Sequence, residues 1–235
     1  MDVEVLPGPS LPELARTALV RAVTATVSGP GQAGGPDLAG QVPVRAGLDG
    51  SPLLLPAAGS PLERQLADCP GAVTVTVPAS TPFHALRVTG TAQPMPQHPA
   101  AGITACLVAP RTVEFTGSRR APVPVEEYQT AVPDPLWQVA PAVLSHLEHG
   151  HLADLVGCVR AHGMTSAEWV VARGLDRYGL ELLVLGPDGA AAVRLSFPGG
   201  PVTSLQDVPV SVRAVLTCRC HAGPGHSAVR PAVGE

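Results

Sequence analysis

Proline and glycine place the strongest limit on how this chain can fold, because 27 Pro and 25 Gly occur among its 235 residues. Proline has no N–H to donate and glycine weakens helix and strand interiors, so both residues concentrate in turns and loops. We therefore expect many short elements joined by tight loops. No run of 18 apolar residues occurs, so the sequence predicts no membrane-spanning helix and no membrane partner.

Composition narrows the classes of function. Apolar residues make up 45% of the chain and charged residues 14%, which is enough to bury a core. The net charge of −4 and the aromatic content of 3% argue against a nucleic-acid partner. All 15 basic residues are arginine, so no lysine can form a Schiff base or serve a P-loop. Five scattered cysteines and an N-terminus without a secretory pattern predict a cytoplasmic protein with free thiols.

The pattern over residues 11–118 predicts a small, mostly antiparallel β-barrel. Helices are expected over 11–20 and 60–69, and in the second Ser60 is the N-cap and Glu63 completes a capping box. Short runs rich in Val and Thr predict the strands, at 22–27, 42–46, 53–55, 72–77, 85–91, 103–108 and 112–115. Many short strands with Gly and Pro turns favour a barrel over a parallel sheet. The Pro-rich residues 119–133 are expected to form a linker.

The pattern changes after the linker, and residues 134–218 predict a small α+β domain. One long helix is expected over 137–162, with an apolar stripe on which His151 lies. Three strands follow and predict a three-stranded antiparallel sheet, at 168–172, 180–185 and 192–197. A last helix is expected over 208–218 and a loose tail over 221–235. The predicted fold class is therefore α+β, a barrel followed by a smaller α+β domain.

Several motifs of this second part resemble those of the HugZ-type heme-utilisation family. They are Asp134-Pro135-Leu136, the His-x-x-x-x-His pair His146 and His151, the turn Gly174-Leu175-Asp176-Arg177-Tyr178-Gly179, and the strand that ends in Phe197-Pro198. The first part resembles the split β-barrel of the pyridoxamine 5′-phosphate oxidase-like superfamily, through its element order and residues 85–92. The resemblance implies a homodimer with its ligand at the dimer interface. Family members bind FMN, bind or degrade heme, or bind protein partners without catalysis, and the fold alone does not choose.

One departure from the family disfavours FMN. Flavin-binding relatives carry a Ser-Arg-Lys type of cluster where the helix after the third strand begins, and there it grips the FMN phosphate. This chain has Ser60-Pro61-Leu62 instead, so the two cations are missing. A phosphate would be left with Ser60, the helix N-terminus and the side chains of Arg45 or Arg64.

Histidines supply the candidate cofactor ligands. His146, His149 and His151 lie within six residues, and one neutral imidazole is enough to hold a heme iron. The alternative is that His146 and His151 are structural and hydrogen-bond the Asp176 turn. His84, before a predicted barrel strand, could also bind a ligand or be a solvated strand-end residue.

Arginines and the C-terminal tail complete the candidate set. Arg111 could hold heme propionates through its guanidinium, or simply be solvated. In the tail, Cys218-Arg219-Cys220-His221 and His226 could hold zinc, although nine residues are a tight span for four ligands. In some heme-degrading relatives a tail histidine holds the iron, so His221 and His226 are candidate iron ligands here, and an ordinary frayed tail remains the alternative.

Heme binding is the function that the sequence predicts, for heme trafficking or for oxidative heme degradation. Two alternatives stay open at this point. One is a flavin-dependent oxidoreductase, and the other is a non-catalytic regulator that has lost its cofactor and binds a protein partner through its C-terminal domain. The sequence therefore does not decide whether the chain is an enzyme.

Overall fold

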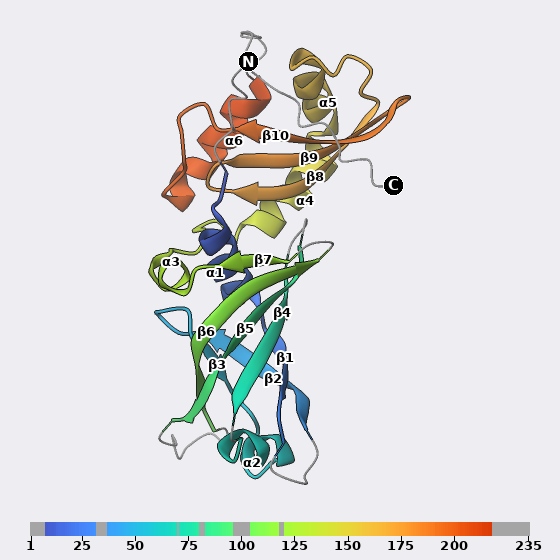
Figure 1. Ribbon diagram of the computed structural model, residues 1–235. Coiled ribbons are helices and arrows are strands. Elements are labelled where there is room, and N and C mark those ends of the chain that lie inside the picture. Colours follow the sequence, from blue (N-terminus) through green and yellow to red (C-terminus); the bar gives the residue numbers. More distant parts are fainter. Residues whose placement is uncertain are drawn as a thin grey trace. The chain divides into compact units, whose positions relative to one another are not determined.

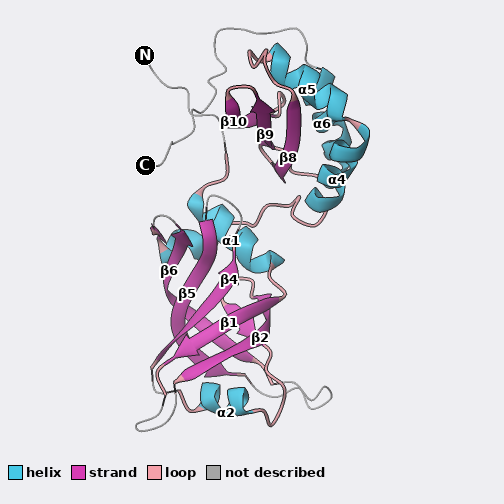
Figure 2. Cartoon of the chain, turned by 90° about the vertical axis from the view of Figure 1, so that its right-hand side faces the viewer, coloured by secondary structure: helices cyan, strands magenta, loops and turns pink. Residues whose placement is uncertain are grey.

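The structure is a computed structural model, and it describes residues 8–31, 37–69, 71–79, 83–95, 104–117 and 120–217. The chain divides into two compact units, one from Ser10 to Pro133 and one that begins at Asp134. Figures 1 and 2 show the first unit as a barrel and the second as a small sheet with helices. None of the helices in the described ranges is long and apolar enough to cross a bilayer.

Six antiparallel strands close the barrel of the first unit. Their order is β3-β2-β1-β4-β5-β6, and a pairing of β3 with β6 completes the ring (Figure 1). The strands are β1 (Thr24–Gly29), β2 (Leu38–Ala46), β3 (Pro52–Leu54), β4 (Ala72–Pro78), β5 (Phe83–Pro94) and β6 (Cys106–Gly117). The predicted α+β fold, with its antiparallel barrel, is thus confirmed. The strands predicted at 103–108 and 112–115 are one strand, β6, whose register with β5 shifts near Gly90.

Alternation of side chains explains why these short segments form a closed barrel. In β4, Val73, Val75 and Val77 point inward and are buried, while the threonines between them face outward and are half-buried. Each strand places every second residue in one core, which is the burial that a period of two residues produces. Helix α1 (Leu11–Arg21) covers part of this core with Ala15 and Leu19.

The segment 119–133, which we expected to form a linker, contains regular structure. Strand β7 (Ala121–Val123) pairs with β6, and helix α3 (Val125–Thr130) follows it. Tyr128 of α3 is completely buried in the barrel core, and its hydroxyl donates a 2.6 Å hydrogen bond to the carbonyl oxygen of Gly50. High proline content predicted a loop here, but burial of this one aromatic side chain attaches the segment to the first unit.

The second unit is a three-stranded antiparallel sheet with helices on one side of it, as Figure 2 shows. Its strand order is β10-β9-β8. The elements are α4 (Ala140–Gly150), α5 (Leu152–Ala161), β8 (Trp169–Asp176), β9 (Gly179–Gly186), β10 (Gly189–Ser196), a 3₁₀ turn (Leu205–Asp207) and α6 (Val208–Thr217). Its core is separate from that of the barrel and centres on Leu147, Leu155, Leu180 and Leu182.

The single long helix that we predicted over 137–162 is wrong, because two helices meet at His151. The backbone of His151 has φ −132° and ψ 23°, which ends α4, and α5 begins at the next residue. Gly150 directly precedes the break, and glycine is the weakest helix former after proline. The apolar period continues through the break, so periodicity alone could not reveal it.

Candidate functional site

The break between α4 and α5 brings together the histidines that the sequence singled out. The rings of His146 and His151 meet edge to face, with their centroids 5.0 Å apart and their planes at 67°. His151 Nδ1 lies 3.0 Å from the Asp154 carboxylate, one turn further on. His146 is exposed and the His151 side chain is 37% exposed, so solvent or a ligand reaches both.

The Asp154 contact determines which nitrogen of His151 can bind a metal. A carboxylate next to Nδ1 favours the tautomer in which Nδ1–H donates, and that tautomer leaves a lone pair on Nε2. The same contact orients the ring and makes Nε2 a better donor to a metal ion. The arrangement can therefore offer one oriented imidazole nitrogen to an iron atom. Sequence reasoning missed Asp154, although its position three residues after His151 was a visible signal.

Two other histidines of this unit are hydrogen-bonded to backbone carbonyl oxygens. His149 Nδ1 lies 2.7 Å from the carbonyl oxygen of Ser145, and His162 Nδ1 lies 2.9 Å from that of Cys158. Both contacts span one helical turn. Within the described ranges, no group of three or more His, Cys, Asp or Glu residues could hold a metal ion. The pair His146 and His151 could thus supply one imidazole nitrogen to a bound iron atom.

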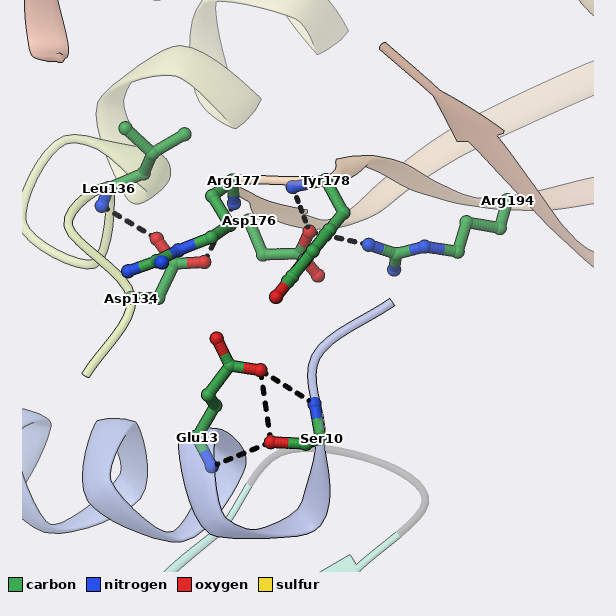
Figure 3. A network of polar contacts seen from close by, with 8 residues as sticks. All are labelled: Ser10, Glu13, Asp134, Leu136, Asp176, Arg177, Tyr178 and Arg194. Carbon is green, nitrogen blue, oxygen red and sulfur yellow. Dashed lines mark hydrogen bonds and ion pairs between the residues drawn. The ribbon is translucent and has the colours of Figure 1, made fainter. Parts of the chain in front are cut away.

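Among the described residues, the Asp176 carboxylate bonds Tyr178 and Arg194, and neither His146 nor His151 makes the hydrogen bond to it that the structural alternative expected. Figure 3 shows that the Asp176 carboxylate accepts hydrogen bonds from the Tyr178 N–H (2.8 Å) and from the Arg194 guanidinium (2.5 Å). In the same view, the buried Asp134 accepts from the N–H groups of Leu136 (2.6 Å) and Arg177 (2.7 Å). These bonds fix the β8–β9 turn and the chain that leads into α4.

The N-terminus of helix α2 (Pro61–Ala67) tests whether FMN fits the barrel. Ser60 accepts a hydrogen bond from the Glu63 N–H, as predicted. The Glu63 carboxylate, however, does not return to Ser60 as a capping box requires. It accepts from the Gly59 N–H at 2.5 Å and from the Thr104 hydroxyl. A carboxylate therefore stands beside this terminus, where a phosphate dianion would be repelled, and Arg64 points to solvent. The residues present do not fit FMN.

A pocket next to α2 is too small to hold either FMN or heme. It holds about 180 Å³ and is lined mainly by apolar groups, with Leu66, Met95, Cys106 and the polar Glu63 and Thr104 among them. Ligand pockets for drug-sized molecules occupy about 300–1,000 Å³. This pocket therefore suits neither a flavin nor a tetrapyrrole. Burial raises the pKa of the Cys106 thiol, which keeps that group neutral.

The remaining predicted site residues are not gathered at one place. Arg45 lies on β2, Arg64 on α2, His84 on β5 and Arg111 on β6, and all four are exposed. Arg45 faces Leu53 across the β2–β3 ladder, and Arg111 lies beside the irregular register of β5 and β6. His221, His226 and the Cys218–Cys220 motif lie outside the described residues.

Comparisons with known proteins identify a shared fold. No family model and no curated protein matches the sequence. A heme-binding protein from Mycobacterium smegmatis matches with a TM-score of 0.68 and 22% identity, over 91% of this chain and 98% of that one. Protein Atu2129, of unknown function, from Agrobacterium tumefaciens matches with a TM-score of 0.44 and 14% identity, over 92% of this chain and 100% of that one.

A third match covers less of the chain. It is a Clostridium acetobutylicum protein of the pyridoxinephosphate oxidase family, with a TM-score of 0.36 and 11% identity, over 46% of this chain and 89% of that one. Of these three proteins, the Mycobacterium protein has the TM-score above about 0.5 that an argument about fold needs. Its likeness shows that barrel and small α+β unit occur together in another protein, whereas membership in the HugZ-type family stays a prediction.

The hydrogen bonds of Glu63 should make the stability of the protein depend on pH in the acidic range. The hydrogen bond from Thr104, together with that from Gly59, lowers the pKa of Glu63 below its ordinary value. A lowered folded-state pKa stabilises the fold above the unfolded pKa of about 4.3, and this stabilisation is lost as pH falls through the folded value. We expect Glu63→Gln to be less stable than the parent at pH 7, and the difference to shrink as pH falls below about 4.3. Urea unfolding at pH 7 and at about pH 3 measures this, with Glu148→Gln on α4 as the exposed control; a difference that is as large at about pH 3 as at pH 7 would contradict it.

Proposed function

We propose that this protein binds heme, and that His151 would hold the iron. The observation that carries the proposal is the contact between His151 Nδ1 and the Asp154 carboxylate, which orients the ring and leaves the Nε2 lone pair on a side chain that is 37% exposed. Heme iron needs only one such nitrogen from the protein.

The shared fold supports this proposal. The structure most similar among those described above belongs to a protein that binds heme, and the likeness covers both units of the chain. The barrel offers less support for a flavin, because Glu63 stands at the α2 terminus. A homodimer and a role in heme trafficking or oxidative heme degradation are compatible extensions of the proposal.

The residues around the iron would have distinct tasks. When bound, heme supplies an iron centre that can take part in redox and oxygen chemistry. His151 would hold the iron, and Asp154 would keep the imidazole ring oriented and its Nδ1 protonated. The His146 ring, edge to face with that of His151, would limit how far the ligand ring can turn.

A hemin titration followed by absorption spectroscopy tests the proposal. We expect a Soret band that saturates at one equivalent, and His151→Ala should weaken hemin binding at least tenfold and shift the band. Asp154→Asn should weaken it less, because it alters only the orientation of the ligand. His149→Ala is the matched control, since the His149 ring is engaged by Ser145.

Two results would overturn this assignment. If the parent gives no saturable Soret band, heme binding itself is wrong. If hemin binds but His151→Ala leaves the affinity and the band unchanged, His151 is not the ligand. Parallel titrations of His221→Ala, His226→Ala and His84→Ala then show whether another predicted histidine takes that place.

A further inference from the structure

The sheet of the second unit has a second apolar face. On the side opposite the helices, neighbouring strands align Trp169, Leu185 and Ala190 in one row. The next row consists of Val171, Leu183 and Ala192. We call these six residues the outer apolar face. The Trp169 side chain is 52% exposed, although tryptophan is usually well buried.

The opposite side of the same strands is filled in the ordinary way. Val170, Leu182, Val184 and Val193 alternate with the residues of the outer apolar face and are buried in the core of this unit. Helices α4, α5 and α6 lie on that side (Figure 2). The sheet therefore carries apolar rows on both faces, and the helices of the described chain cover one of them. A sheet that is apolar on both faces is typical of a layer packed between helices.

Charged residues border the outer apolar face at one end. Beyond Val171, the chain bulges at Arg173, and Glu181 of β9 and Arg194 of β10 complete the border. Arg194 is already bonded to Asp176. Arg173 is exposed and its guanidinium makes no hydrogen bond or ion pair within the described residues, so it is the cation available to a partner. Glu181 is half-buried against Gly174.

The dimensions of this face argue against a stable dimer of the chain formed through it. Three strands about 4.8 Å apart and eight residues at about 3.3 Å each give roughly 350 Å² for the whole outer side once side chains are included. Two such faces would bury about 700 Å², and stable protein interfaces bury about 1,200–2,000 Å². A single helix about 10 Å wide matches the two apolar rows, which are about 7 Å apart.

We propose that the outer apolar face binds an amphipathic helix of a protein partner, and that an acidic residue beside the apolar stripe of that helix pairs with Arg173. The helix would pack on the sheet as α4 and α5 do on the other side. The small area implies a weak, transient complex, as in signalling encounters. Apolar contact with Trp169 and Leu183 would supply most of the affinity, and Arg173 would supply the preference for acidic partners.

Trp169 fluorescence provides the assay. The chain has two tryptophans, so Trp137→Phe leaves Trp169 as the single reporter. The probes are two synthetic helices of about four turns, each with a leucine stripe, one flanked by glutamates and the other by lysines. We expect a saturable shift of the emission to shorter wavelength, with the acidic helix bound at least fivefold more tightly. Leu183→Ser should abolish the shift.

A charge reversal distinguishes the proposed complex from non-specific hydrophobic binding. Arg173→Glu should invert the preference so that the lysine-flanked helix binds more tightly, whereas Arg213→Glu, exposed on α6, should leave it unchanged. Absence of a saturable shift with both helices, or an unchanged preference in Arg173→Glu, would overturn the proposal. Sedimentation equilibrium completes the test, because self-association that Leu183→Ser abolishes would assign the face to a second copy instead. The assay uses no heme and is independent of His151.

Discussion

Replacing Gly50 by alanine is expected to lower the free energy of unfolding by about 3–4 kcal/mol. Gly50 has φ +79°, a conformation that costs a residue with a Cβ about 1–2 kcal/mol. An added Cβ would also collide with the Arg16 guanidinium and come within 2.9 Å of the Tyr128 ring. Both neighbours are buried, so neither can move aside into solvent.

The contacts of Arg16 explain why a Cβ at position 50 would lower the free energy of unfolding. Its Nη2 donates a 2.7 Å hydrogen bond to the carbonyl oxygen of Leu48, and its guanidinium lies 5.7 Å from the centre of the Tyr128 ring. A hydrogen bond from a charged group contributes about 1.5–3 kcal/mol, and a displaced, buried guanidinium would lose it. The turn at residues 47–51 would then lose its main support, although Asp49 would still bond Ser51.

Gly59→Ala is the matched control. Gly59 has nearly the same φ, +74°, but an added Cβ would meet nothing within 4 Å. We expect it to cost about 1–2 kcal/mol, which is the conformational part alone. Urea unfolding followed by circular dichroism measures both variants. Equal losses of stability in the two would show that the Arg16 and Tyr128 contacts contribute nothing, contrary to the expectation.

The difference between these two glycines illustrates which features the sequence could predict. Alternation of Val and Thr at residues 73–77 predicted a half-buried strand, because the period of two is a local property. The contact between Tyr128 and Gly50 joins residues 78 positions apart. No local pattern encodes this contact, so the proline content of the segment 119–133 predicted only a linker. The same holds for Glu63 and Thr104, which are 41 positions apart.

In the candidate site, too, the sequence predicted the local features and missed those that depend on the three-dimensional arrangement. The sequence placed His146 and His151 within six residues of each other, but a continuous helix turns by about 140° over that step and puts them on different flanks, so their ring contact was not predicted. The break at His151 escaped prediction because the apolar period continues across it, and only Gly150 marked the position. The tautomer of His151 depends on the rotamers of His151 and Asp154, which no periodicity in the sequence supplies. Scattered arginines such as Arg45 and Arg111 could not be grouped from the sequence, because strand register decides their neighbours.

Asp134→Ala is expected to lower the free energy of unfolding by about 3 kcal/mol. The buried Asp134 carboxylate accepts hydrogen bonds from the Leu136 and Arg177 N–H groups, which lie on two segments of the second unit. Its removal leaves these donors without that acceptor, and a buried unsatisfied donor costs about 1–3 kcal/mol. Asp134→Asn retains one acceptor oxygen and turns an NH₂ group toward the second donor, so its loss should be smaller but still above about 1 kcal/mol. Asp154→Ala, at an exposed carboxylate, is the control for a lost surface charge.

The pH dependence distinguishes this buried carboxylate from an ordinary surface one. Burial raises the pKa of Asp134 in the folded state, although the N–H groups of Arg177 and Leu136 oppose that shift. A raised folded-state pKa means that the native protein binds more protons than the unfolded chain, so its stability falls as pH rises above the ordinary Asp value of about 3.9. The stability lost in Asp134→Ala should therefore be larger near pH 4 than at pH 7. A loss that grows from pH 4 to pH 7 would show that the ionised carboxylate is the favoured form, and that the hydrogen bonds of Leu136 and Arg177 outweigh its burial.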